Sequence, residues 1–253
     1  MITVALLIAY DGTNYGGWQI QKNKITVQEK LEAALSDILG ERIPVTASGR
    51  TDSGVHAAAQ VCHFRAQTAI PPEKFADALN VRLPGDISVL RSVSAPDGFD
   101  SNRSAKKKTY AYRMYFAPRR NPLKDRYSVW VKGSADLDKL KHIAGAFEGV
   151  HDFKAYCKSG SKVKTTVRGV CSVNVVIREE RFGTDVEIRV CGGGFLYNMV
   201  RTIAGTMLYY AQGVLTEENI LKSLSEGDRS LVGKTMPARG LTLEEVDYGF
   251  NLF

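Results

Sequence analysis

The chain has 253 residues, of which 44% are hydrophobic and 24% charged, a composition typical of soluble globular proteins. No apolar run is long enough to span a membrane, and Met1–Tyr10 lacks the basic segment and cleavage site of an export signal. We therefore expect a cytoplasmic protein with no membrane association. The four cysteines and four histidines do not have the spacing of zinc ligands, so no metal site is expected.

The net charge of +7 is concentrated in two stretches of the chain. Nine Lys or Arg and a single acid, Asp125, lie between Ser101 and Arg126. Five bases and no acid, with Lys162 among the bases, lie between Lys154 and Arg168. These stretches could be solvated surface, but like charges without counter-charges persist mainly where a polyanion neutralises them. The pattern favours a nucleic acid as the partner.

In the first hundred residues, the apolar pattern predicts strands and helices in alternation. Residues 2–10 alternate as a strand with one buried face does. Thr26 as an N-cap and Gly40 as a stop predict a helix that runs to about Leu39. The remaining elements expected here are strands at 43–47, 60–65 and 87–93 and a helix from Pro71 to about Val81.

The second half repeats this mixture of elements. Strands are expected at 109–116, 167–177, 185–191 and 241–250, with a turn near Phe182-Gly183, and helices at 137–147, 195–213 and 216–224. Two such halves predict an α+β protein of two ferredoxin-like units, which share an extended, mixed and largely antiparallel sheet with helices behind it. The basic stretch 101–108 is the expected boundary, with an N-terminal domain at 1–104 and a C-terminal domain at 105–253.

The ten residues Ser48–Ala57 are the most informative in the chain. Two glycines indicate a backbone that is left-handed or closely approached, and one carboxylate, Asp52, lies at the centre. A hairpin turn whose Asp bonds its own backbone is the alternative. Arg201 is the second candidate, because it lies on an almost wholly apolar helix and should be largely buried. It could bond helix-end carbonyls or pair with Asp52, and that pairing would keep the carboxylate ionised as suits a nucleophile.

The sequence Gly49-Arg-Thr-Asp-Ser-Gly-Val-His-Ala57 resembles the active-site motif of the tRNA pseudouridine synthase A family. The resemblance extends over nearly the whole chain, through further segments in the expected order. These are Tyr10–Thr13, Gly17–Gln21, Thr26–Gln28 with Leu31-Glu32, Lys108–Tyr112, His151–Phe153, Phe195–Arg201 and Gly240-Leu241. One departure is visible at Asn102, where the family usually has Arg; the neighbouring Arg103 is a possible substitute.

The resemblance implies the pseudouridine synthase fold and the isomerisation of uridine to pseudouridine at positions 38 to 40 of the tRNA anticodon stem-loop. It implies that Asp52 is the nucleophile, that Tyr110 stacks on the target base, and that Arg201 pairs with Asp52. Arg50 would take the place of the flipped base. A homodimer that grips tRNA is also implied, with no metal and no organic cofactor.

The residues themselves are compatible with this chemistry. A base inside a stem must be flipped out at a cost of a few kcal/mol, and stacking on Tyr110 would return roughly 1–3 kcal/mol. The basic side chains of Lys106, Lys107 and Lys108 would hold the tRNA backbone. Asp52 could attack C6 of uracil or C1′ of ribose, and the sequence leaves both open.

Two other classes of protein are alternatives to a pseudouridine synthase. A non-catalytic RNA-binding protein on the same scaffold would gain nothing from a carboxylate that faces phosphates. A glycosidase needs a second carboxylate near Asp52, and the motif has none.

Overall fold

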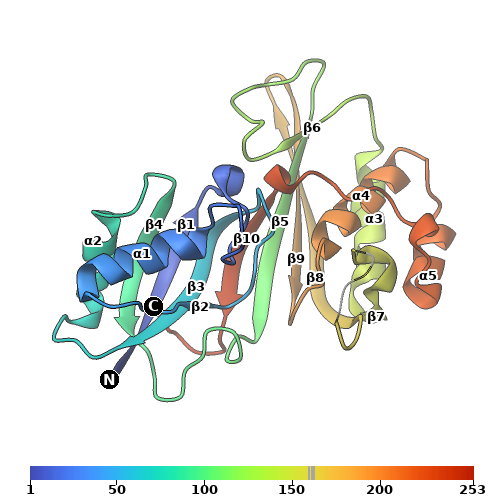
Figure 1. Cartoon of the computed structure of the whole chain (residues 1–253). Coiled ribbons are helices and arrows are strands. Elements are labelled where there is room, and N and C mark those ends of the chain that lie inside the picture. The colour runs from blue at the N-terminus through green and yellow to red at the C-terminus, as the bar shows by residue number, and fades with distance from the viewer. Residues whose placement is uncertain (159, 161–162) are drawn as a thin grey trace. The chain divides into compact units, whose positions relative to one another are not determined.

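The structure, a computed structural model, describes residues 1–158, 160 and 163–253 and contains two compact units (Figure 1). The first unit comprises Met1–Lys108 and Thr242–Phe253, and the second comprises Thr109–Leu241. The sequence predicted a domain boundary between residues 104 and 105, with all later residues in the second domain. Residues 242–253 return to the first unit because β10 (Leu241–Asp247) pairs in parallel with β3 (His56–Ala66).

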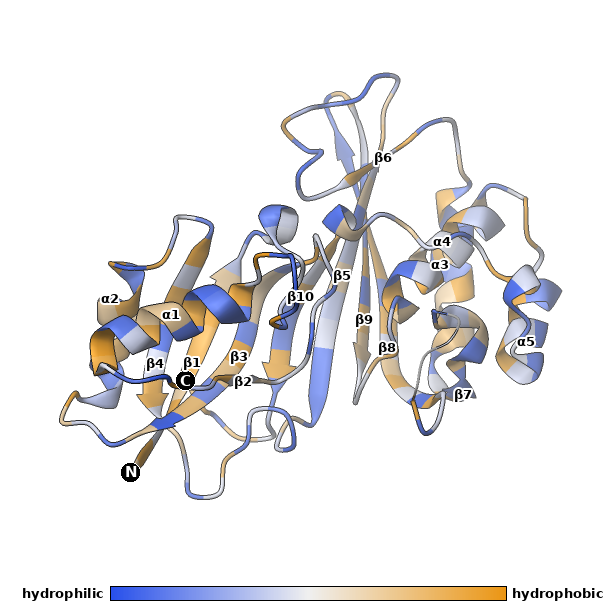
Figure 2. Cartoon of the chain, in the orientation of Figure 1, coloured by the Kyte–Doolittle hydropathy of each residue, from blue (hydrophilic) through white to orange (hydrophobic). Residues whose placement is uncertain are grey.

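The sheet of the first unit has the strand order β4-β1-β3-β10. Strand β1 (Ile2–Tyr10) is antiparallel to both β3 and β4 (Ile87–Ser94), and β2 (Thr46–Ala47) also pairs with β3. The alternation predicted for β1 is confirmed, since Val4, Leu6 and Ile8 are fully buried. Figure 2 shows β1 and β3 largely in the hydrophobic colour, as expected of strands covered on a face.

Two helices, α1 (Val27–Leu39) and α2 (Phe75–Asn80), cover one face of this sheet (Figure 1). Helix α1 has the predicted ends: Thr26 and Glu29 form a reciprocal capping box, and Gly40 closes it. Helix α2 is shorter than the predicted 71–81, because Pro72–Lys74 form a single 3-10 turn before it.

The predicted strand at 43–47 is reduced to the two residues of β2. The backbone of Val45 is bonded to helix side chains instead of to a strand. Its N–H donates to Glu32 Oε1 at 3.0 Å, and its carbonyl accepts from Gln28 Nε2 at 3.2 Å. Helix α1 therefore satisfies groups that a ladder would otherwise have used.

A second apolar cluster, formed by Ala5, Val61, Phe99 and Tyr248, contains a side chain from the returning C-terminal segment. The Tyr248 hydroxyl also donates to the Ser101 carbonyl at 2.8 Å. This segment is thus an integral part of the first unit's core.

The second unit contains strands in the order β5-β9-β8-β7. Their bounds are β5 (Lys107–Phe116), β9 (Gly183–Gly192), β8 (Val167–Glu180) and β7 (Gly149–Asp152), and β6 (Val129–Val131) pairs in parallel with β5. The β8–β9 hairpin turns at Arg181-Phe182, near the predicted Phe182-Gly183, and Gly183 pairs with Glu180 as the first residue of β9. The strands β6 and β7 were not predicted.

The helices of the second unit are α3 (Leu137–Ala144), α4 (Met199–Ala211) and α5 (Glu217–Glu226). Helix α4 begins four residues after the predicted Phe195, because the residue before it, Asn198, has a left-handed backbone with φ of 68°. Mixed, largely antiparallel pairing with packed helices confirms the predicted α+β class.

Within residues 1–158, 160 and 163–253, no helix has the length and apolarity needed to cross a bilayer. The same residues contain no group of three or more His, Cys, Asp or Glu placed to hold a metal ion. Lys162, one of the bases in the second basic stretch, lies outside the described residues.

Candidate active site

The loop around Asp52 connects β2 to β3 and has the backbone that its glycines predicted. Gly54 has a left-handed backbone, with φ of 78°. Asp52 is half-buried, whereas Arg50 beside it is exposed. The candidate nucleophile is therefore carried on a tight turn and reaches solvent.

The residues on both sides of Asp52 are bonded to the segment Tyr10–Trp18. The Thr51 carbonyl accepts a hydrogen bond from the Trp18 N–H at 3.1 Å, and the Thr51 hydroxyl lies 2.8 Å from the Tyr10 hydroxyl. The Ser53 hydroxyl donates to the Tyr15 carbonyl at 3.2 Å. These bonds fix the backbone from which the Asp52 side chain projects.

Gly17 makes this contact possible. Its φ is 98°, and a Cβ atom built on it would lie 2.4 Å from the Thr51 carbonyl oxygen. The motif around Asp52 does not by itself predict this contact; the paired Gly16-Gly17 before Trp18 are the signal that could have indicated it.

Tyr10, whose hydroxyl lies against Thr51, is buried. Desolvation raises the pKa of Tyr10 well above its usual value, although its hydrogen bond with Thr51 works in the opposite direction. A phenol is neutral at physiological pH even at its ordinary pKa, so Tyr10 serves as a neutral structural partner for Thr51.

The start of the loop is held by a different set of bonds. The Ser48 hydroxyl donates to Gln60 Oε1 at 2.6 Å, and Gln60 Nε2 donates to the Gly49 carbonyl at 3.0 Å. Asn102 Nδ2 donates to the Ser48 carbonyl at 2.9 Å. Asn102, where the sequence departs from the family pattern, thus binds the backbone that leads from β2 into the Asp52 loop. Arg103 is exposed and donates its backbone N–H to Asp100.

The three lysines predicted to bind tRNA differ in their environments. Lys106 and Lys107 are exposed, and the first residues of β5 are hydrophilic in Figure 2. Lys108 is half-buried, and desolvation lowers the pKa of its ammonium group.

The other two predicted residues lie in the second unit. Tyr110 on β5 is 8% exposed, and its ring meets that of Phe195 edge-to-face at 5.2 Å between centroids. Arg201 on α4 donates from Nε to the Met236 carbonyl and from Nη1 to Asn198 Oδ1, both at 2.8 Å. Arg201 lies in the first turn of α4 and is half-buried, more exposed than residues 202–208 that follow it.

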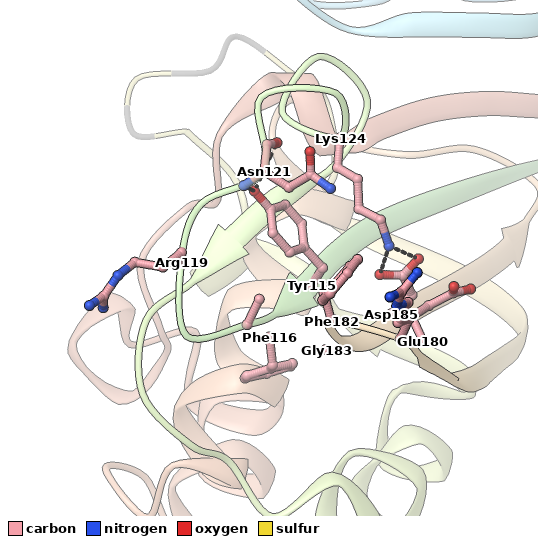
Figure 3. Close-up of a pocket in the computed structure, with 11 residues that line it drawn as sticks. Tyr115, Phe116, Arg119, Asn121, Lys124, Glu180, Phe182, Gly183 and Asp185 are labelled. Atoms are coloured by element: carbon pink, nitrogen blue, oxygen red, sulfur yellow. Dashed lines mark hydrogen bonds and ion pairs between the residues drawn. The ribbon is translucent and has the colours of Figure 1, made fainter.

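A separate pocket lies in the second unit, between the end of β5 and the β8–β9 hairpin (Figure 3). The Lys124 ammonium binds both carboxylate oxygens of Asp185 at 2.6 Å, and the Tyr115 hydroxyl donates to Asp125 at 2.8 Å. None of the predicted site residues lines this pocket. Lys124 and Asp185 neutralise each other there, and we do not assign the pocket to the reaction.

Comparison with known proteins identifies the family. A family model described as tRNA pseudouridine synthase matches residues 6–101 and 143–249. Asp52 and Arg201 lie inside the matched stretches, and Lys106–Lys108 and Tyr110 lie between them. The tRNA pseudouridine synthase A of Ruminiclostridium cellulolyticum is 44% identical over 98% of this chain and 100% of its own. Those of Geotalea uraniireducens and Clostridium acetobutylicum are 44% and 41% identical over the same shares of each chain.

These matches define the class of protein as an RNA-modifying isomerase. The chain belongs to the tRNA pseudouridine synthase family. A solved structure of an H/ACA RNP bound to a substrate RNA containing 2′-deoxyuridine is also similar, at 11% identity and a TM-score of 0.37, over 94% of this chain and 59% of that one. That similarity is too weak to carry a conclusion.

Proposed function

We propose that this chain converts uridine to pseudouridine at one or more of positions 38, 39 and 40 in the anticodon stem-loop of tRNA, with Asp52 as the nucleophile. The observation that carries the proposal is the anchored loop: Thr51 and Ser53, on either side of Asp52, are bonded to the segment Tyr10–Trp18, and Asp52 itself is half-buried. A group held in this way is pre-organised to attack a bound nucleoside.

The reaction needs one nucleophile and no redox partner. The C1′–N1 bond of uridine breaks, the uracil rotates, and a C1′–C5 bond forms; the C5 proton leaves and N1 gains a proton. Attack of the Asp52 carboxylate on C6 or on C1′ would keep the base bound during rotation. Both routes remain within the proposal, which includes no metal or organic cofactor.

Substrate binding in this proposal requires base flipping, because a base stacked in a stem is out of reach of a carboxylate. Arg50, which is exposed beside Asp52, takes the place of the flipped base. Tyr110 stacks on that base, and Lys106, Lys107 and Lys108 contact the RNA backbone. By resemblance to the family, Arg201 pairs with the Asp52 carboxylate, and the enzyme acts as a cytoplasmic homodimer.

The test is release of tritium from RNA that carries [5-³H]uridine, because only formation of the C1′–C5 bond removes the C5 hydrogen. Anticodon-arm transcripts with a single uridine at position 38, 39 or 40 are incubated with the wild-type chain and with Asp52→Asn. We expect release from at least one transcript with the wild type and from none with Asp52→Asn. Tight RNA binding by a wild-type chain that releases no tritium would favour a non-catalytic RNA-binding protein instead.

A further inference from the structure

Lys108 differs from the two lysines that precede it in the sequence. Lys106 and Lys107 are exposed, whereas the Lys108 side chain lies against the Asp52 loop. A Cβ built on Gly49 would lie 3.5 Å from both Cε and Nζ of Lys108. The ammonium group is therefore held over the backbone of the loop, three residues before the candidate nucleophile.

The charge of Lys108 has no partner in the part of the chain that the structure describes. Burial lowers the pKa of Lys108, and no carboxylate acts to raise it again. Lys124 in the second unit is also partly buried, with 32% of its side chain exposed, but it pairs with Asp185 at 2.6 Å. An ammonium group that loses water without gaining a counter-charge is destabilising.

The loop backbone beneath Lys108 is held by a side chain of β3. Gln60 Nε2 donates to the Gly49 carbonyl at 3.0 Å, so the backbone that the ammonium group lies against is anchored. An exposed lysine such as Lys107 can follow the RNA backbone and neutralise whichever phosphate is nearest. A half-buried cation against an anchored backbone has less room to move, so it discriminates better between neighbouring phosphates.

We propose that Lys108 binds one particular phosphate of the RNA backbone, next to the nucleoside that Asp52 attacks, and so positions that nucleoside. The inference rests on the proposed function and deepens it. RNA supplies one anion per nucleotide, and a phosphate oxygen would give the Lys108 ammonium a charge-assisted hydrogen bond that none of the described residues provides.

The first experiment compares Lys108→Met with the matched control Lys107→Met. Lys108→Met should raise the melting temperature of the free protein by about 2 °C, because an uncompensated charge is replaced by an apolar side chain of similar length. The same change should lower kcat/KM for an anticodon-arm RNA about 10- to 100-fold, whereas Lys107→Met should lower it only a few fold. If Lys108 had a merely structural role, Lys108→Met would lower the melting temperature instead of raising it.

The second experiment locates the phosphate. Anticodon arms with a single methylphosphonate, which removes one backbone charge, are tested at each position around the target with wild-type and variant proteins. At one position the losses from Lys108→Met and from the methylphosphonate should be non-additive, whereas Lys107→Met should be additive with every substitution.

The outcomes separate the two levels of inference. A wild-type chain that forms no pseudouridine overturns the proposed function itself. An active wild type with Lys108→Met equal to Lys107→Met, or with additive losses at every phosphate, overturns the role of Lys108 alone.

Discussion

Replacing Gly17 with alanine should test whether the Tyr10–Trp18 segment positions Asp52, the proposed nucleophile. The new Cβ would lie 2.4 Å from the Thr51 carbonyl oxygen and 2.9 Å from the Asp52 carbonyl carbon. Real Cβ atoms essentially never come within 3.0 Å of such a neighbour, so the loop must move by at least the difference between 3.0 and 2.4 Å, which is 0.6 Å. Backbone atoms cannot rotate away from this overlap as the end of a side chain can.

Two costs combine at this position. An alanine at φ of 98° costs about 1–2 kcal/mol, and overpacking of this kind adds about 1–3 kcal/mol. We expect Gly17→Ala to lower the free energy of unfolding by about 2–5 kcal/mol in urea titrations. Because a shift of about 1 Å in a catalytic group can cost 100-fold, kcat for pseudouridine formation should fall about 10- to 100-fold.

Gly40→Ala is the matched control. Gly40 also has a left-handed backbone, with φ of 73°, but a Cβ there would have no atom within 4 Å. The Gly40→Ala variant should lose only the backbone cost of about 1–2 kcal/mol and keep the wild-type kcat. Equal losses of stability in the two variants, together with full activity of Gly17→Ala, would show that close approach of the two segments does not position Asp52.

Further predictions concern the proposed roles of other residues. Asp52→Ala should abolish tritium release while the Kd for tRNA, measured by filter binding, stays within a few fold of wild type; parallel losses in both would argue against a chemical role. Tyr110→Ala should lower affinity for the reacting RNA by about 1–3 kcal/mol, and Tyr110→Phe should retain it; a large loss of turnover in Tyr110→Phe would assign the hydroxyl a part in proton transfer at C5. The double variant Lys106→Ala/Lys107→Ala should weaken the binding of all tRNAs alike and flatten the dependence of Kd on salt concentration. Weaker binding of one tRNA alone would contradict contact with the RNA backbone. Burial lowers the pKa of His63 in the folded chain, so the unfolded chain binds the proton more readily, and the free energy of unfolding should fall as pH drops through about 6.5. Urea titrations should show a smaller fall in His63→Gln, and an equal fall would exclude His63 as a source of this pH dependence.

Local patterns predicted those elements whose stability comes from local contacts. Strand β1 and helix α1 matched their predicted bounds, since Thr26 and Gly40 determine the ends of the helix within one segment. The tight glycine turn at Asp52 was predicted for the same reason.

The differences arose where distant residues supply the partners. Val45 reads as a strand residue, but its N–H is bonded by Glu32, which the alternation of apolar residues cannot reveal. Arg201 Nε donates to the Met236 carbonyl, which lies 35 residues further along the chain, and the apolar pattern of α4 does not reveal this partner. The bonds from Trp18 and Tyr15 to the Asp52 loop likewise join segments more than thirty residues apart in the sequence.

The parallel pairing of β10 with β3 has a consequence for biosynthesis. The ribosome completes Met1–Lys108 early, but Thr242 and Leu243, which pair with His56 and Ala57 just after the Asp52 turn, emerge only after the whole second unit has been made. Until then the edge of β3 beside the turn lacks these backbone partners, and Phe99 lacks the Tyr248 ring. Nascent chains should therefore show slow maturation of the first unit, late in translation and sensitive to any change that delays packing of Tyr248.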